Sequence, residues 1–224
     1  MENAASEVRG YDFFTEDIVE KHFADMNIKL LSGRHIQQED VNAFLLLEDF
    51  YPDLRNFYQK IYQLDLVRDI ADQRAYFYLD FFDGGKGKLT DASRHRTLTE
   101  MQTVTGLLLL DMYYSRYFEH PKMITWSDIK QEIEEGDHKT DYQRILFPEI
   151  RAGYSDAEWA MVDRRFREVI QSFHLLGWVN RLSGQQEELL FEIKPSIHRM
   201  AMLYAEELEN FTSFSENYKS RAEE

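Results

Sequence analysis

The fold is decided by the stretch QQEDVNAFLLLEDFYPDLRNFYQKIYQLDLVRDIADQRAYFYLDF, residues 37–81. In its first part, over 37–50, apolar residues such as Val41, Phe44 and Leu45 lie three or four positions apart. That spacing predicts a helix with a heavily apolar face. Pro52 marks the start of another helix, because proline is favoured in a first helical turn. The stretch therefore begins with two consecutive helices.

The second part of the stretch changes its period. LDLVRD (64–69) and AYFYLDF (75–81) are short, rich in strand-forming residues and partly alternating, as expected of paired strands. A polar segment of about four or five residues, including Asp72, joins them, so a hairpin is predicted. A further helix is predicted upstream over 15–31, with Thr15 as its N-cap. Three helices followed by a hairpin form the winged-helix order.

The second half of the chain repeats this order. A helix over 98–118 would be apolar on nearly all of its sides, which predicts that it is buried, and MITW (123–126) predicts a short strand. Ser127 is the expected cap of a helix that runs to Ile133, and a polar loop is expected over 134–144.

Helical spacing is clearest over 156–176, and the segments that follow predict a second hairpin. Its strands are WVNRL (178–182) and ELLFEI (188–193), joined by a turn at 183–184. An amphipathic helix over 196–209 is expected to close the fold, before a loose polar end. The predicted fold class is mainly α with small β-hairpins (α+β), as tandem winged-helix domains plus a C-terminal helix. The predicted segments are a flexible N-terminus (1–14), a first winged-helix domain (15–82), a linker (83–96), a second winged-helix domain (97–194), and a C-terminal helix and tail (195–224).

Composition narrows the functional classes. The chain has 224 residues, no Cys and a net charge of −15. The lack of Cys excludes disulfides, thiol nucleophiles and thiolate zinc sites. Because of this net negative charge, the chain as a whole is repelled by nucleic acid and by anionic membranes. Protein partners are therefore expected, at least one of them basic. The opening MENAASEVRG has no secretory pattern, and the longest apolar run is far below the ~20 residues of a membrane span.

Motifs of catalysis and metal binding are missing from the sequence. None of the seven His residues has a metal-ligand partner at a spacing such as HExxH, and no GxSxG motif occurs. Carboxylates are too abundant for any pair to indicate acid–base chemistry. We therefore predict a protein that is not an enzyme and that has no cofactor, metal or small-molecule substrate.

Two basic segments are candidates for DNA-phosphate contacts. Arg164, Arg165 and Arg167 lie on the long helix, where the alternative is a solvated face balanced by neighbouring acidic residues. GGKGKL (84–89) is not a P-loop, so the favoured interpretation is a flexible linker. The other interpretation is a phosphate-contacting loop. Its basic residues are Lys86, Lys88, Arg94 and Arg96.

Aromatic residues exceed what two small cores need, and aromatic residues are enriched at protein interfaces. The predicted C-terminal helix also has an apolar stripe that no later element covers. The candidate partner-binding or dimer-interface residues are Phe57, Tyr58, Tyr62, Tyr113, Tyr114, Tyr117, Phe118, Met200 and Tyr204.

The chain resembles the MukE family, including its MksE-like branch, across about residues 28–193. These proteins are small subunits of bacterial condensin-type SMC complexes. The resemblance depends on an ordered series of segments rather than on one motif. They are SGRHI (32–36), NAFLLLEDF (42–50), the FY pair (57–58), YFYL (76–79), LTEMQTVTGLLLLDMYYS (98–115) and HLLGWV (174–179).

The resemblance implies a tandem winged-helix homodimer that binds a kleisin subunit, MukF-like or MksF-like. The kleisin bridges the heads of an SMC ATPase, MukB-like or MksB-like, which hydrolyses ATP. The implied role is chromosome organisation and segregation, or plasmid restriction, at a cytoplasmic, nucleoid-associated location. The chain departs from its relatives at His174 and Leu175, where MukE proteins tend to have basic residues.

The alternative function is a winged-helix DNA-binding transcription regulator. That class needs a basic face on the third helix of the first unit. The sequence offers only Arg55 and Lys60 there, opposed by Asp53. Specific DNA recognition is therefore disfavoured.

Overall fold

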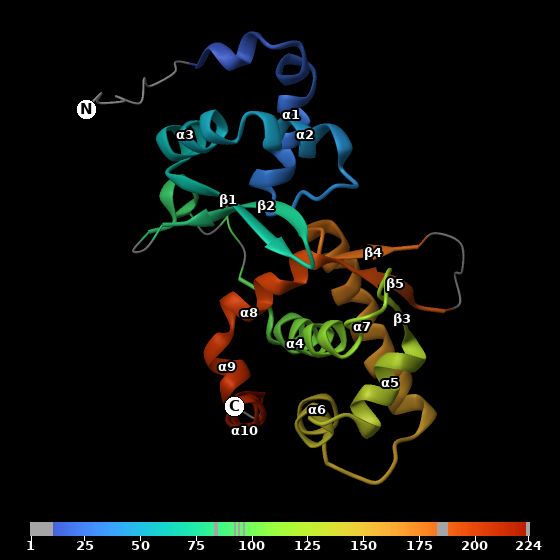
Figure 1. The fold of residues 1–224 in the computed structure, drawn as a ribbon. Coiled ribbons are helices and arrows are strands. Elements are labelled where there is room, and N and C mark those ends of the chain that lie inside the picture. Colours follow the sequence, from blue (N-terminus) through green and yellow to red (C-terminus); the bar gives the residue numbers. More distant parts are fainter. Residues whose placement is uncertain are drawn as a thin grey trace, which may run out of the picture. The chain divides into compact units, whose positions relative to one another are not determined.

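The computed structural model describes residues 11–82, 85–91, 93, 95, 97–182 and 188–222, with side chains as far as residue 217. The chain divides into two compact units, Met1–Arg96 and Thr97–Glu224. Helices predominate in both, and each contains one small antiparallel sheet (Figure 1). The predicted mainly helical fold with small β-hairpins is confirmed.

The first unit has the predicted order of three helices and a hairpin. Ile36 forms a single β-bridge with Phe77 of the hairpin, so the segment between the first two helices is the third member of the sheet. Leu54, Tyr58 and Leu66 pack in the core beneath it. The elements are η1 (Tyr11–Thr15), α1 (Asp17–Leu31), α2 (Val41–Asp49), α3 (Tyr51–Tyr62), β1 (Leu64–Ala71), β2 (Arg74–Phe81) and η2 (Gly87–Leu89).

The predicted apolar face of α2 is wrong. Val41 and Leu45 are 57% and 46% exposed, whereas Ala43, Leu46 and Leu47 are buried. The helix reads VNAFLLLED, which is apolar on most sides, so spacing alone could not select the buried face.

The start of the unit also differs from the prediction. Residues 11–14 were expected to fray, yet η1 is folded and Phe13 is buried. Thr15 is not the cap of α1, because Glu16 holds that position and Thr15 Oγ1 donates to the carbonyl of Asp12. Residues 1–10 lie outside the described residues.

The hairpin turn is tighter than predicted. Only Asp72 and Gln73 separate the strands, and their φ angles are 48° and 61°. Two successive positive φ values define the type I′ turn, whose twist matches that of paired strands.

The second unit has the same plan, with one additional helix before its hairpin and a helical segment after the hairpin. Its three-stranded sheet has the order β3-β5-β4, so the strand after the first helix pairs with the last strand, as Ile36 does in the first unit. The elements are α4 (Glu100–Ser115), β3 (Met123–Thr125), α5 (Trp126–Glu135), α6 (Lys139–Leu146), α7 (Asp156–Leu176), β4 (Val179–Arg181), β5 (Leu190–Ile193), η4 (Pro195–His198), α8 (Arg199–Leu203), α9 (Ala205–Glu209) and α10 (Phe211–Ala222).

Helix α4 is buried on nearly every side, as predicted from its composition. Helix α7 packs its regular apolar positions, including Phe166 and Phe173, into the same core. It ends at Gly177, whose φ of 79° favours glycine. The second hairpin is confirmed, although its predicted turn at 183–184 lies outside the described residues.

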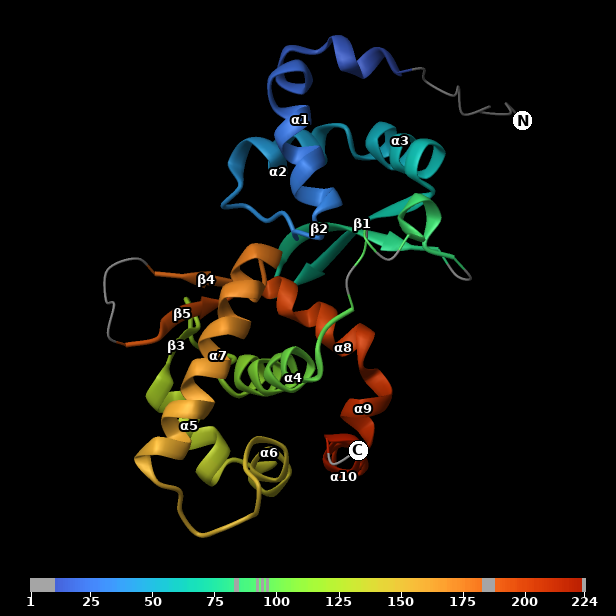
Figure 2. The same ribbon diagram turned by 180° about the vertical axis from the view of Figure 1, so that it is seen from behind.

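Three predictions for this unit are wrong. The cap of α5 is Thr125, not Ser127. The expected loop over 134–144 contains most of α6, which is stabilised by the burial of Tyr142 and Ile145. The C-terminal segment is three short helices instead of one, and its last helix, α10, lies beside α6 (Figures 1 and 2).

Candidate partner-binding surfaces

Among the residues whose side chains are described, the most exposed aromatic residues of the second unit lie where α4 ends. Tyr114, Tyr117 and Phe118 are 51%, 60% and 92% exposed. We call residues 114–119 the aromatic loop. Because a fully exposed phenylalanine gains nothing from burial in its own chain, its position suits contact with another molecule.

The aromatic loop is fastened by polar contacts on both sides. Arg116 Nη1 donates to the carbonyl of Met123 at 2.8 Å, and its Nη2 donates to Asp128 Oδ1 at 2.6 Å. Lys122 is buried, and its ammonium donates to the carbonyls of Tyr117 at 3.3 Å and Glu119 at 3.2 Å. A charged donor gives strong hydrogen bonds to carbonyls, so the loop holds its aromatic residues in a defined geometry.

The ring of Tyr113 lies beneath this loop. Lys122 Nζ is 4.6 Å from its centroid, within the range of a cation–π interaction. On the other side, His198 packs edge-on against Tyr113, and its Nδ1 is 3.2 Å from the Tyr114 hydroxyl. The loop is therefore supported by α4, β3 and the residues before α8.

Asp128 is the acidic residue that accepts the hydrogen bond from Arg116. Burial by itself would raise the pKa of Asp128, but hydrogen bonds from the side chain and backbone of Thr125, together with Arg116, hold that pKa below its ordinary value. Thr125 and Asp128 also form the capping box of α5. One carboxylate thus fixes both the start of α5 and the end of α4.

Several candidate interface residues belong to the core. Tyr58, Tyr113 and Met200 are buried, and the Tyr58 hydroxyl donates to Asn27. They stabilise the chain and do not lie on its surface. Tyr204 is half-buried, and its hydroxyl accepts a hydrogen bond from Thr103.

Phe57 and Tyr62 of α3 are half-buried for a different reason. The ring of Phe57 is edge-on to the rings of Tyr11, Phe14 and Phe23 at 5.3–6.1 Å between centroids. The N-terminal turn η1 therefore covers this part of α3. The helical spacing of apolar residues did not predict η1. The three aromatic residues in YDFFT were the signal in the sequence that this segment is folded.

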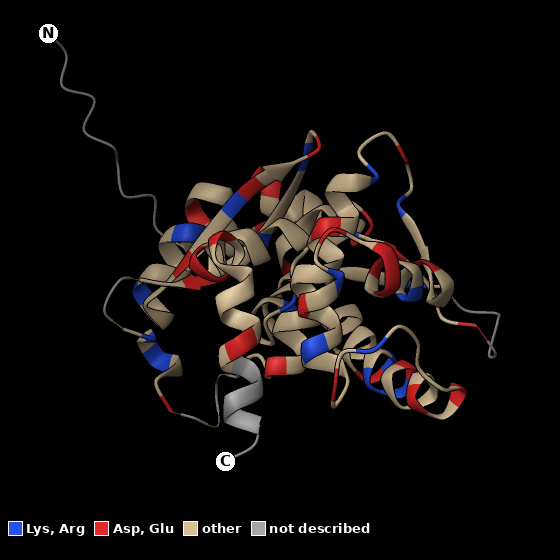
Figure 3. Ribbon diagram, turned by 90° about the horizontal axis from the view of Figure 1, so that it is seen from below, with Lys and Arg blue, Asp and Glu red and all other residues tan. Residues whose placement is uncertain are grey.

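The basic residues of α7 are only partly available. Arg164 and Arg165 are exposed, whereas Arg167 pairs with Asp163 at 2.8 Å. Arg181 on β4, which was not predicted, donates to Gln171 of α7. Acidic and basic residues are interspersed over the ribbon in Figure 3. On α7 itself, Arg164 and Arg165 are therefore the exposed candidates for phosphate contacts.

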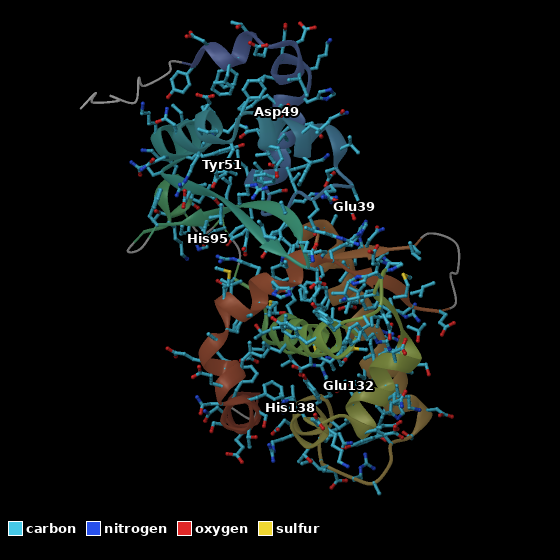
Figure 4. The ribbon with its side chains drawn as sticks, viewed as in Figure 1. Glu39, Asp49, Tyr51, His95, Glu132 and His138 are labelled. Atoms are coloured by element: carbon cyan, nitrogen blue, oxygen red, sulfur yellow. The ribbon has the colours of Figure 1, made fainter. Side chains whose placement is uncertain are left out.

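The segment predicted as a linker is folded where it is described. Gly87 has a φ of 53°, and a Cβ there would come within 2.4 Å of the Gln63 carbonyl oxygen at the end of α3. Lys86 Nζ lies 2.6 Å from Nε2 of His95, which is labelled in Figure 4. Lys88 is the remaining described candidate of this segment, since Arg94 and Arg96 lie outside the described residues.

In the first unit, α3 holds the position of a DNA-reading helix. Arg55 forms two hydrogen bonds with Asp65, at 2.7 and 3.0 Å, which engage two of its guanidinium nitrogens inside the unit. Lys60 is the other basic residue of the helix, and Asp53 opposes it. The geometry does not favour base recognition by α3.

A carboxylate pair in the second unit escaped the sequence analysis. Burial raises the pKa of Asp111, against the opposing effect of a 2.6 Å hydrogen bond from the Tyr142 hydroxyl. Burial and the charge of Asp111 raise the pKa of Glu132 (Figure 4). In the described part of the chain, no group of three or more His, Asp or Glu side chains is arranged to hold a metal ion.

The described residues contain no helix long and apolar enough to cross a membrane. By fold and surface, the chain belongs to the class of mainly helical proteins with two units of winged-helix order. Comparison with known proteins is more specific. The profile of the family described as "Condensin complex protein MksE" matches residues 21–205, so the chain belongs to the MksE family.

Curated relatives agree with this assignment. The chain is 26% identical to the chromosome partition protein MukE of Histophilus somni, over 79% of this chain and 67% of that protein. It is 27% identical to MukE of Mannheimia succiniciproducens, over 79% and 68%. It is 25% identical to MukE of Vibrio cholerae, over 70% and 63%. The chain is thus a condensin-type chromosome partition subunit, and the predicted MukE/MksE resemblance is confirmed.

A chain of a solved Nse1-Nse3-Nse4 complex gives a TM-score of 0.38 at 11% identity, covering 79% of this chain and 69% of that chain. A TM-score of 0.38 does not establish a shared fold.

Proposed function

We propose that this chain is a non-enzymatic subunit that binds the kleisin of a condensin-like SMC complex, MukF-like or MksF-like. Each of its two units acts as a winged-helix domain. Through the kleisin it joins an SMC ATPase, MukB-like or MksB-like, and it forms a homodimer. The complex works at the nucleoid in the cytoplasm, in chromosome organisation or plasmid restriction.

The observation that carries the proposal is the aromatic loop. Phe118 and Tyr117 are exposed on a backbone that Arg116 and Lys122 hold in place. A preorganised aromatic pair needs little ordering on binding, which favours affinity for a protein partner. Aromatic residues are also among the commonest energetic centres of protein interfaces.

Direct DNA contact is a secondary part of the proposal. Arg164 and Arg165 are exposed on α7, and in a winged helix this element faces DNA. Two or three phosphate contacts supply weak, salt-sensitive binding without sequence recognition. Such contact is useful only where other subunits also hold the DNA.

Co-purification tests the proposal. The full chain is co-expressed with a tagged kleisin encoded beside it, and with an unrelated tagged protein as control. We expect a complex with the kleisin that survives gel filtration. Failure to copurify, combined with tight binding to a single operator sequence at low nanomolar concentration, would instead establish the transcription regulator.

A further inference from the structure

The C-terminal segment 199–222 is divided into three helices that its sequence does not divide. We call this segment the strap. Tyr204 separates α8 from α9 and Asn210 separates α9 from α10, with ψ angles of 37° and 44°. The strap contains no Pro and no Gly, the residues that ordinarily interrupt a helix. The interruptions must therefore come from tertiary contacts.

The interruptions remove local stabilisation. Helices α8 and α9 have five residues each, far below the ~12–15 residues at which an isolated helix is marginally stable. Every helix start leaves backbone N–H groups unsatisfied, and no side chain caps the start of α9. Helix α9 also buries no residue. Leu208 packs half-buried against the core, but no residue of α9 is fully buried, so the middle of the strap contributes less to the fold than its two ends.

The base of the strap is firmly attached. Met200 occupies the space beside Gly106 of α4, where a Cβ would come within 2.4 Å of its Cε atom. The hydroxyl of Tyr204 accepts a hydrogen bond from Thr103 at 3.0 Å. The chain direction is therefore fixed as far as the first interruption.

The tip of the strap is attached through α10, which docks on α6. The buried ring of Phe211 lies 5.1 Å from that of Tyr142 and 5.2 Å from that of His138, measured between centroids. His138 is labelled in Figure 4, where it lies between α6 and α10. This contact supplies the apolar half of the docking site.

The polar half of the docking site is equally specific. Ser215 is fully buried, and its hydroxyl donates to Asp141 at 2.7 Å and accepts from Arg144 at 2.6 Å. Thr212 donates to the other oxygen of Asp141 at 3.2 Å. The α6 surface therefore matches the aromatic ring and both hydroxyls of this chain's own α10.

Two conformations of the strap, bent and straight, are therefore in competition. Docking of α10 favours the bent strap, whereas helix propagation favours a continuous helix of about 36 Å over 199–222. A straight strap would carry α10 away from its own α6. The α6 of a second copy offers the same ring and hydroxyl partners, so exchange loses no docking contact and restores helical hydrogen bonds.

We propose that two copies of this chain exchange their straps, so that α10 of each copy docks on α6 of the other. The proposal rests on the homodimer proposed above and names the segment that joins it. It does not depend on the kleisin. The occupant is a second copy because the docking surface fits Phe211, Thr212 and Ser215 in detail.

Cross-linking between single-cysteine chains tests the exchange, because the natural chain has no Cys. One full-length chain carries Lys139→Cys, and a second, with a different tag, carries Glu216→Cys, both at exposed positions that leave the docking contacts intact. The two are co-expressed and treated with a short bis-maleimide. We expect a cross-linked species that carries both tags. Adding Ser215→Asp, which opposes Asp141, should abolish it, and Ser213→Asp at an exposed position of the same helix should not.

A second variant examines the interruption itself. Asn210→Ala favours a continuous helix and should raise the association constant of the exchanged dimer by about threefold per strap, from the difference in helix propensity. Light scattering gives the mass in parallel. A dimer without the two-tag species overturns the exchange and leaves the homodimer standing. A monomer at every concentration overturns both, while kleisin copurification reports separately on kleisin binding.

Discussion

The guanidinium of Arg116 donates to the carboxylate of Asp128 across 2.6 Å and so ties the end of α4 to the start of α5. Residues between these two helices carry the aromatic loop and the strand β3. The contact therefore links the stability of the second unit to the geometry of the exposed side chains of Tyr117 and Phe118.

Asp128→Ala should lower the free energy of unfolding by about 1–2 kcal/mol at pH 7, since it removes a capping box together with an ion pair. The folded-state pKa of Asp128 is lowered, so its contribution is present above the ordinary pKa of about 4 and is lost as pH falls through the lowered value. Urea titrations at pH 7 and pH 3.5 measure this. The role of Asp128 would be contradicted if Asp128→Ala lowered the free energy of unfolding as much at pH 3.5 as at pH 7. It would also be contradicted if Asp156→Ala, at the start of α7, caused an equal loss at pH 7.

Asp111→Asn, unlike Asp128→Ala, should raise the free energy of unfolding at pH 7. Burial raises the pKa of Asp111, so the folded state disfavours the ionised form, and stability falls as pH rises from the unfolded pKa through the folded one. Asparagine removes the charge and still accepts from Tyr142. We expect a higher urea midpoint at pH 7 and a smaller gain near pH 4. Glu134→Gln on the exposed face of α5 is the control, and a lower midpoint at pH 7 would contradict the prediction.

Gly87→Ala tests whether residues 85–91 belong to the first unit. A side chain there requires a positive φ and meets the carbonyl oxygens of Tyr62 and Gln63. We expect a loss of about 1–3 kcal/mol in the free energy of unfolding. Gly85→Ala is the matched control, because nothing lies within 4 Å of a Cβ at that position. Equal behaviour of the two variants in thermal denaturation would mean that the segment is a loose linker.

The order of elements was predictable because the apolar spacing of α3 and α7 and the alternation in β1 and β2 are local signals. The buried face of α2 was not, since VNAFLLLED is apolar on most sides and only the packing against α1 selects Leu46 and Leu47. Helix α6 was missed because EEGDHKTDYQR is polar, and its stability depends on burying Tyr142 and Ile145 against distant residues.

The sequence indicated which types of residue form the candidate surfaces, but it could not indicate which of those side chains are exposed. Tyr113 and Tyr114 are neighbours with similar chemistry, yet one is buried under Lys122 and the other is exposed. Their difference arises because consecutive residues of α4 point to different sides of the helix, and only the Tyr113 side faces the core. Likewise, Arg164 is exposed, whereas Arg167 is half-buried and pairs with Asp163.

Charge reversal on α7 tests the DNA contact. Arg164→Glu with Arg165→Glu should weaken non-specific DNA binding by the assembled complex and reduce the slope of log affinity against log salt by about two, since each phosphate contact contributes about one. Fluorescence anisotropy with a random-sequence duplex measures both quantities. A comparable loss of slope from Lys60→Glu on α3 would show that only the total charge matters.

The most direct test of the account is the affinity of the full chain for its kleisin, measured by isothermal titration calorimetry with and without Phe118→Ala. Truncation of a central aromatic residue should weaken binding at least about tenfold, or about 1.4 kcal/mol, without moving the urea midpoint. Ile28→Ala, which removes another exposed apolar side chain, should change the affinity less than about twofold. Unchanged affinity in the Phe118→Ala chain, or no binding by the natural chain, would contradict kleisin binding through the aromatic loop.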